Sequence, residues 1–195
     1  MDKLYMILLC LMIVPILICI KYSRKIKSDV ASSIVKCLIF TIVTILSNGL
    51  SAFSGNETFS YIMEALYRFS FDLMLIYVLQ YSQQYTRVFH EVSPFKKGCF
   101  IIAYLDGILL FLNIIFHNVF TIETVRFPNF DMYHVADKSI IFYFHYVFAY
   151  GLVFCIIASF IIKIIQIPDF YRKKYLPILV LMLSLIHIWR CRRRG

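Results

Sequence analysis

The sequence predicts a membrane protein of the all-α class: a polytopic helical bundle with five complete transmembrane helices, a truncated sixth helix and the amino terminus outside. Hydrophobic residues make up 61% of the chain and its mean hydropathy is +0.78, whereas charged residues make up 16%. Soluble domains carry roughly 25% charged residues. Apolar runs long enough to cross a bilayer recur along the chain, and basic residues gather in alternate connections. These observations exclude a soluble domain and intrinsic disorder, and they predict a multi-pass protein of the plasma membrane.

Each expected helix is an apolar run bounded by polar or basic residues. The first run has no charged residue and is followed by a basic cluster, with no small-residue cleavage site, so it is interpreted as an uncleaved helix and not as a signal peptide. The second run ends at a turn-like Ser-Gly-Asn stretch, which predicts that it forms an antiparallel hairpin with the third. The expected helices cover residues 4–20, 30–53, 59–81, 98–117, 139–162 and 175–182 onward.

The distribution of Lys and Arg predicts the orientation, because cytoplasmic loops of membrane proteins are enriched in these residues. The connections at 21–29, 82–97 and 163–174 contain eleven of them together, whereas the opposite set contains Lys3, Arg126 and Lys138. The first set is therefore expected in the cytoplasm.

The longest outside connection, residues 118–138, is expected to contain a β-hairpin. Apolar and polar residues alternate from Thr121 to Phe127, and Pro128-Asn129 follows as a turn. Such an arm could cover the outer end of the bundle as a small lid.

Three ionisable residues share one face of the third expected helix. Glu64, Arg68 and Asp72 are spaced four residues apart, and Asp106 lies within the fourth expected helix. Ionisable groups in a bilayer are expensive unless they are paired or hydrated. Two interpretations stay open: a self-paired network that fixes helix packing, with Arg68 between the two carboxylates, and a polar pocket, open to the outside, in which Glu64 and Arg68 bind a small ligand.

Motifs for catalysis, metal binding and cofactors are not visible in the sequence. There is no Gly-rich phosphate loop, no HExxH and no Ser/His/Asp arrangement. Five of the six cysteines lie in apolar runs without the spacing of a zinc site, and they are interpreted as small buried hydrophobes. We therefore predict no catalytic residue, no metal and no cofactor. The basic residues follow the expected membrane topology, so nucleic-acid binding is not predicted.

The carboxyl-terminal residues 183–195 contradict the charge pattern, since four Arg residues there would lie outside. The run Leu183 to Ile188 and the Arg-Cys-Arg-Arg that follows Trp189 resemble the translated end of a library-preparation adapter. We therefore expect a partial domain over residues 4–182 and a sequencing artefact over 183–195. The alternative is a native basic patch that binds anionic lipid.

Two segments carry a resemblance to a known family. Residues 142–150, Phe-Tyr-Phe-His-Tyr-Val-Phe-Ala-Tyr, lead into residues 167–175, Ile-Pro-Asp-Phe-Tyr-Arg-Lys-Lys-Tyr, and residues 71–81 precede a polar loop. This pattern resembles the N-terminal seven-helix (7TM) sensory region of bacterial histidine kinases and GGDEF diguanylate cyclases. The resemblance implies that His145 and Tyr146 belong to the sensing site, although a lone His in a bundle is more often simply hydrogen-bonded.

The resemblance also implies a function. The chain would be the membrane-embedded sensory input module of a truncated signal-transduction protein, whose lost output is a diguanylate cyclase or a histidine kinase. Its expected partners are the lipid bilayer, an unknown small-molecule or lipid-borne signal and a second copy of the chain. The alternatives are a small polytopic transporter or channel, and a structural membrane subunit.

Overall fold

The computed structural model describes residues 2–52, 56–87, 93–127 and 130–166, and within them five long helices and one β-hairpin. The expected helices are observed with ends that differ by a few residues, except that the third ends at Thr86 and the fourth begins at Ser93. The expected sixth helix and the suspected artefact lie outside the described residues. The elements are α1 (Asp2–Ser23), α2 (Asp29–Ala52), α3 (Glu57–Thr86), α4 (Ser93–Phe116), β1 (Phe120–Phe127), β2 (Phe130–Lys138) and α5 (Ile140–Gln166).

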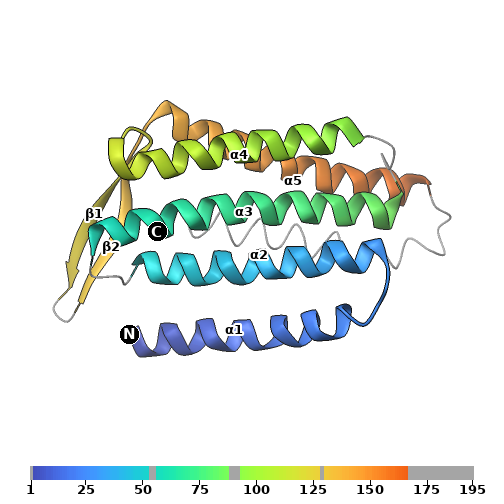
Figure 1. Cartoon of the computed structure of the whole chain (residues 1–195), viewed down its shortest axis with the longest axis horizontal. Helices are drawn as coiled ribbons and strands as arrows, with labels where there is room; N and C mark the ends of the chain where they lie inside the picture. The colour runs from blue at the N-terminus through green and yellow to red at the C-terminus, as the bar shows by residue number, and fades with distance from the viewer. Residues whose placement is uncertain (1, 53–55, 88–92, 128–129, 167–195) are drawn as a thin grey trace.

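The helices lie roughly along one axis, and successive helices run in opposite directions (Figure 1). α3 contacts α2, α4 and α5, whereas α1 contacts α2. The hairpin lies at the end of the bundle where α4 ends and α5 begins, which is also the end where α1 starts (Figure 1). α3 is therefore the helix with the most neighbours, and its side chains form much of the core.

Three described helices are long and apolar enough to cross a membrane: α2 over Asp29–Ser51, α4 over Pro94–Phe116 and α5 over Ile140–Gln166. α1 contributes a shorter apolar segment, Leu11–Ser23. α3 is long enough to cross a membrane, but it is more polar than these three helices because it carries several charged residues. The prediction of a helical membrane protein is thus confirmed at the level of three candidate spans.

Small polar side chains line the contact between α2 and α3. The hydroxyls of Thr44 and Ser70 are 3.0 Å apart, and Ser33 Oγ donates to Gln84 Oε1 at 2.8 Å. Small residues let two backbones approach closely, and their hydroxyls form hydrogen bonds between helices, as is common in membranes. This contact holds the polar helix α3 against a more apolar neighbour.

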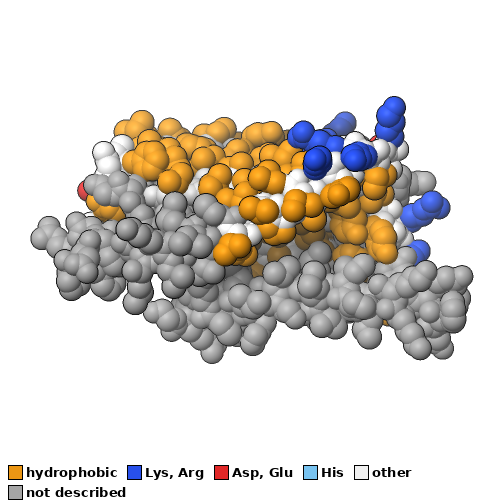
Figure 2. Space-filling view, turned by 90° about the horizontal axis from the view of Figure 1, so that it is seen from below, with side chains coloured by type: hydrophobic (Ala, Val, Ile, Leu, Met, Phe, Trp, Pro, Cys, Tyr) orange, Lys and Arg blue, Asp and Glu red, His pale blue; other side chains and the backbone are white. Residues whose placement is uncertain are grey.

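The outer surface of the bundle is apolar along its length and basic at one end. Large side chains of α4 and α5 are exposed, among them Ile115 (71%) and Phe154 (72%). Figure 2 shows the molecule from the side of α1, where the described surface is also largely hydrophobic and Lys and Arg side chains gather at the end opposite the hairpin. An exposed apolar surface of this extent is typical of lipid contact. Cys19 also lies on the surface, so the expectation that it is buried is wrong; Cys99 is buried as expected.

The predicted hairpin is confirmed. β1 and β2 pair antiparallel, with Ile122 opposite Val135 and Phe127 opposite Phe130. The side chain of Asn113, at the end of α4, accepts hydrogen bonds from the backbone N–H groups of Val119 (2.6 Å) and Phe120 (3.3 Å). The fold is therefore helical, as predicted, with the expected β-hairpin at one end of the bundle.

Candidate functional site

Glu64 and Arg68 form a buried ion pair on α3. The two residues are one helical turn apart, and Arg68 Nη2 donates to Glu64 Oε1. Ser51 of α2 donates from Oγ to the other carboxylate oxygen of Glu64 at 3.3 Å. The side chains are 10% and 8% exposed, so the pair lies in a region where an unpaired charge would be costly.

Aromatic rings surround the guanidinium of Arg68. Its Cζ lies 4.2 Å from the ring centre of Phe142 and 5.6 Å from that of Phe120, and Nη1 is 3.4 Å from the hydroxyl oxygen of Tyr146. The negative faces of aromatic rings attract a cation, with about 2 kcal/mol or more per contact when water is excluded. The rings come from β1 and α5, so Arg68 links α3 to both the hairpin and α5.

A second buried group joins three helices. Asp72 of α3, Asp106 of α4 and His145 of α5 are exposed by 0%, 2% and 2%. His145 Nδ1 lies 2.7 Å from Asp106 Oδ2 and 3.2 Å from Asp72 Oδ2. We call these three side chains the core triad.

The core triad contains two acidic groups and one imidazole. A single N–H on Nδ1 of His145 can be directed to one acceptor, and the hydrogen bond goes to Asp106. His145 Nδ1 also lies 3.2 Å from Asp72 Oδ2, but with its N–H directed to Asp106, neither oxygen of Asp72 accepts a well-aligned hydrogen bond from the described residues. With both carboxyl groups ionised, the three side chains carry a net negative charge even when the imidazole is protonated. A buried net charge is unfavourable, so the triad is suited to bind a positive species, either a proton or a metal ion.

The structure brings together all six residues predicted from the sequence, in two adjoining groups. Tyr146 joins the first group, with Glu64 and Arg68, and the core triad forms the second. One expected detail differs: Arg68 pairs with Glu64 only, because the guanidinium lies over the ring of Phe142 while Asp72 approaches His145.

Other residues of this region were not predicted from the sequence. Phe142 and Phe120 surround Arg68, and the Tyr61 hydroxyl accepts a hydrogen bond from the Ile122 N–H at 3.0 Å, which attaches the hairpin to α3. These contacts join residues far apart in the chain, so local spacing carries no signal for them. The same is true of the core triad as a set of metal-ligating side chains, which has no counterpart in a short motif.

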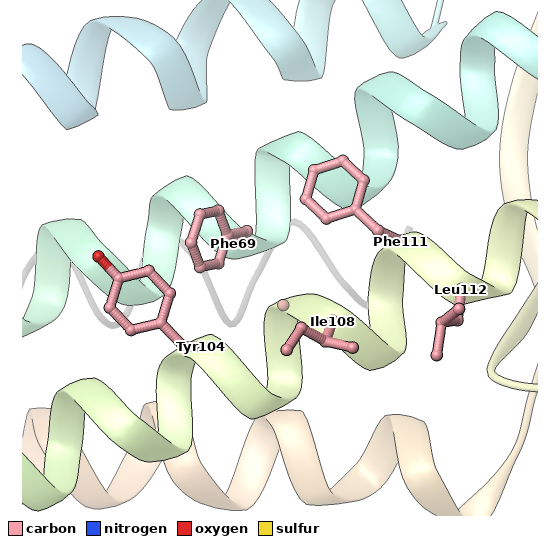
Figure 3. A pocket seen from close by; sticks show the side chains of 6 residues that line it. Phe69, Tyr104, Ile108, Phe111 and Leu112 are labelled. Carbon is pink, nitrogen blue, oxygen red and sulfur yellow. The ribbon is translucent and has the colours of Figure 1, made fainter.

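A hollow between α3 and α4 has a different character. It holds about 310 Å³ and is lined by Phe69, Gly107 and apolar residues of α4 (Figure 3). The lining has no charged side chain, and Ile108 and Leu112 in it are exposed on the apolar outer surface. This hollow is consistent with contact to an acyl chain and is separate from the polar groups.

Comparisons with known proteins leave the family of the chain open. The chain matches no protein-family model, and no curated protein is significantly similar to it.

Proposed function

We propose that the chain is a membrane-embedded sensory input module that receives a signal in its polar core and passes a helix displacement to a cytoplasmic output. The observation that carries this proposal is the convergence of charged side chains from α3, α4 and α5 in the core of the bundle. Ionisable residues inside a membrane are rare, and they generally have a function.

The proposed orientation places the hairpin outside and the basic end in the cytoplasm. The Lys and Arg side chains at the end opposite the hairpin (Figure 2) support it, because cytoplasmic ends are enriched in such residues. In this arrangement α1 and α3 also cross the plasma membrane, which gives five spans. At 1.5 Å per residue, the 30 residues of α3 reach about 45 Å, enough to cross, while α2, α4 and α5 shield its charges from lipid.

The signal would leave the core along α5. His145 and Tyr146 lie close to the hairpin end of this helix, which continues as one element to Gln166 near the basic end. A change in the partners of His145 alters what holds α5 against α3 and α4, and a helix moves as a stiff body. The resemblance of residues 142–150 to histidine kinase sensory regions supports this direction, with a diguanylate cyclase or histidine kinase as the output of a dimeric parent protein.

A small transporter or channel is the second candidate. The observation that favours it is the row of Glu64, Arg68 and Asp72 along one face of α3, which could form part of a path for ions. A structural subunit that only recruits partners is the third candidate, and it would neither transmit a signal nor transport ions.

One pair of measurements separates the three functions. Spin labels are attached at Arg87→Cys and Ile165→Cys, which lie at the basic ends of α3 and α5, in a background without native cysteines, and the distance between them is measured in nanodiscs. A sensor should show a change of that distance when Asp106→Asn removes the acceptor of His145. The exposed Glu123→Gln on the hairpin is the matched control and should leave the distance unchanged.

The same proteins in vesicles with a trapped pH-sensitive dye report ion flux under an imposed potassium gradient. A distance change without flux supports the sensor. Flux through the wild-type protein supports the transporter and overturns the sensor. If neither a distance change nor flux is observed, the structural subunit is the remaining function.

A further inference from the structure

We propose that the core triad of Asp72, Asp106 and His145 binds one divalent transition-metal ion. This inference deepens the proposed function, and it rests on that function for the consequence of binding, because it names the class of ligand that the polar core recognises. Binding itself is measured without any signalling readout.

The spacing of the ligating atoms fits one ion. One atom from each of the three side chains lies within 4.8 Å of the others. Zn²⁺ bonds to nitrogen and oxygen are about 2.1 Å long, so two ligands of one ion are about 3.4 Å apart in a tetrahedral arrangement and about 4.2 Å apart at most. Asp106 Oδ2 and Asp72 Oδ2 already lie 2.7 and 3.2 Å from His145 Nδ1. Both distances are thus within about 0.7 Å of the tetrahedral spacing, and the two carboxylate oxygens lie within 4.8 Å of each other.

Asp72 provides the independent observation that points to a ligand. Its side chain is completely buried and faces His145 Nδ1, yet neither oxygen accepts a hydrogen bond from the described residues. The nearby cation, Arg68, is paired with Glu64 and lies among aromatic rings instead. The lone pairs of Asp72 are thus available to a metal ion, whereas Asp106 already accepts from His145.

A divalent ion would also balance the charge of the core triad. Two carboxylates, one neutral imidazole and one divalent cation sum to zero, so a bound ion removes the net negative charge from the core. One nitrogen and two oxygen donors suit the ions that accept imidazole, such as Zn²⁺, better than Ca²⁺ or Mg²⁺, which prefer oxygen alone. Three protein ligands also leave coordination positions for water or a further group.

The test uses the full chain, purified without a polyhistidine tag, in lipid nanodiscs that are dialysed against Zn²⁺. Elemental analysis should find one Zn²⁺ per chain. Asp72→Asn and His145→Asn should each weaken binding at least tenfold. The matched control is His117→Asn, which replaces an exposed imidazole outside the triad and should bind as the wild type does. No Zn²⁺ on the wild-type protein, or equal losses in Asp72→Asn and His117→Asn, would overturn the proposal.

A variant that gains a spectroscopic signal on metal binding keeps the proposal testable if Asp72→Asn or His145→Asn fails to fold. His145→Cys replaces the nitrogen ligand by sulfur, whose longer metal bond offsets the shorter side chain. With Co²⁺ this variant should show a sulfur-to-cobalt charge-transfer band in the near ultraviolet, which the Co²⁺-loaded wild type lacks. Absence of the band from folded protein contradicts coordination at residue 145.

The metal site and the sensory function can fail separately. Zn²⁺ binding by a protein that also conducts ions retains the metal site and overturns the sensor. A distance change in Asp106→Asn without any Zn²⁺ binding by the wild type retains the sensor and overturns the metal site.

Discussion

At the scale of single residues, Arg68 is the side chain on which the buried charge of Glu64 depends. It is held by Glu64 and by the rings of Phe142 and Tyr146, so its removal strands a carboxylate in the core. Breaking a buried ion pair from one side typically costs about 3–5 kcal/mol, whereas replacing both partners by neutral groups can be nearly neutral.

The first prediction follows from this asymmetry. Arg68→Gln should destabilise the bundle by about 3–5 kcal/mol, and the double variant Glu64→Gln/Arg68→Gln should recover most of that loss. The measurement is reversible unfolding in mixed micelles followed by circular dichroism. If the single variant is as stable as the wild-type protein, the pair does not stabilise the helix packing.

At the scale of elements, α3 and α4 pack closely where the ring of Phe69 lies on Gly107. A Cβ atom at Gly107 would lie 2.5 Å from Cδ2 of the Phe69 ring, so the ring would have to move. Figure 3 shows Phe69 above α4 at this point, beside the apolar hollow.

The second prediction is that Gly107→Ala destabilises the protein by about 1–3 kcal/mol through overpacking. Gly151 of α5 is the matched control, because a Cβ atom there would lie more than 4 Å from every described neighbour. Gly151→Ala should leave stability unchanged or raise it by up to about 1 kcal/mol, since Ala favours helix. Thermal unfolding of both variants in the same detergent makes the comparison, and equal melting temperatures would contradict the close approach.

The hairpin is held to the bundle by the Asn113 amide, which accepts from two backbone N–H groups and donates to the Phe120 carbonyl at 2.9 Å. The third prediction is that Asn113→Ala speeds amide hydrogen exchange in β1 about tenfold or more, because stranded buried polar groups cost about 1–3 kcal/mol each. Exchange in α5 should be unchanged. Asn118→Ala, at an exposed position five residues later, is the control and should exchange as the wild type does.

At the scale of the whole molecule, the proposed orientation is tested by thiol labelling of intact cells. A membrane-impermeant reagent should label Glu123→Cys on the hairpin, whereas Ser28→Cys, between α1 and α2, should react only after permeabilisation. Both positions are exposed, so access and not burial decides the outcome. The reverse pattern would place the basic end outside and contradict the charge rule for this chain.

The sequence predicted the parts of the fold that depend on local pattern. Hydropathy located α2, α4 and α5, and the alternation from Thr121 onward located the hairpin. Spacing placed Glu64 and Arg68 on one face. It could not show that His145 reaches Asp106, because that contact depends on how α4 and α5 rotate and pack against α3, which involves residues 39 positions apart. The aromatic rings around Arg68 could not be predicted either, because they come from β1 and α5, which are distant from Arg68 in the sequence.

The polar character of α3 has a consequence for biogenesis. A charged residue at the centre of a helix opposes insertion by the translocon by about 2.5–3.5 kcal/mol, so α3 is a poor candidate for insertion alone. When α3 leaves the ribosome, α2 is already present with Ser51 opposite Glu64, but His145 has not yet been synthesised. In the proposed five-span arrangement, stable insertion of α3 would therefore await α5, and the helices would assemble as a group and not one span at a time.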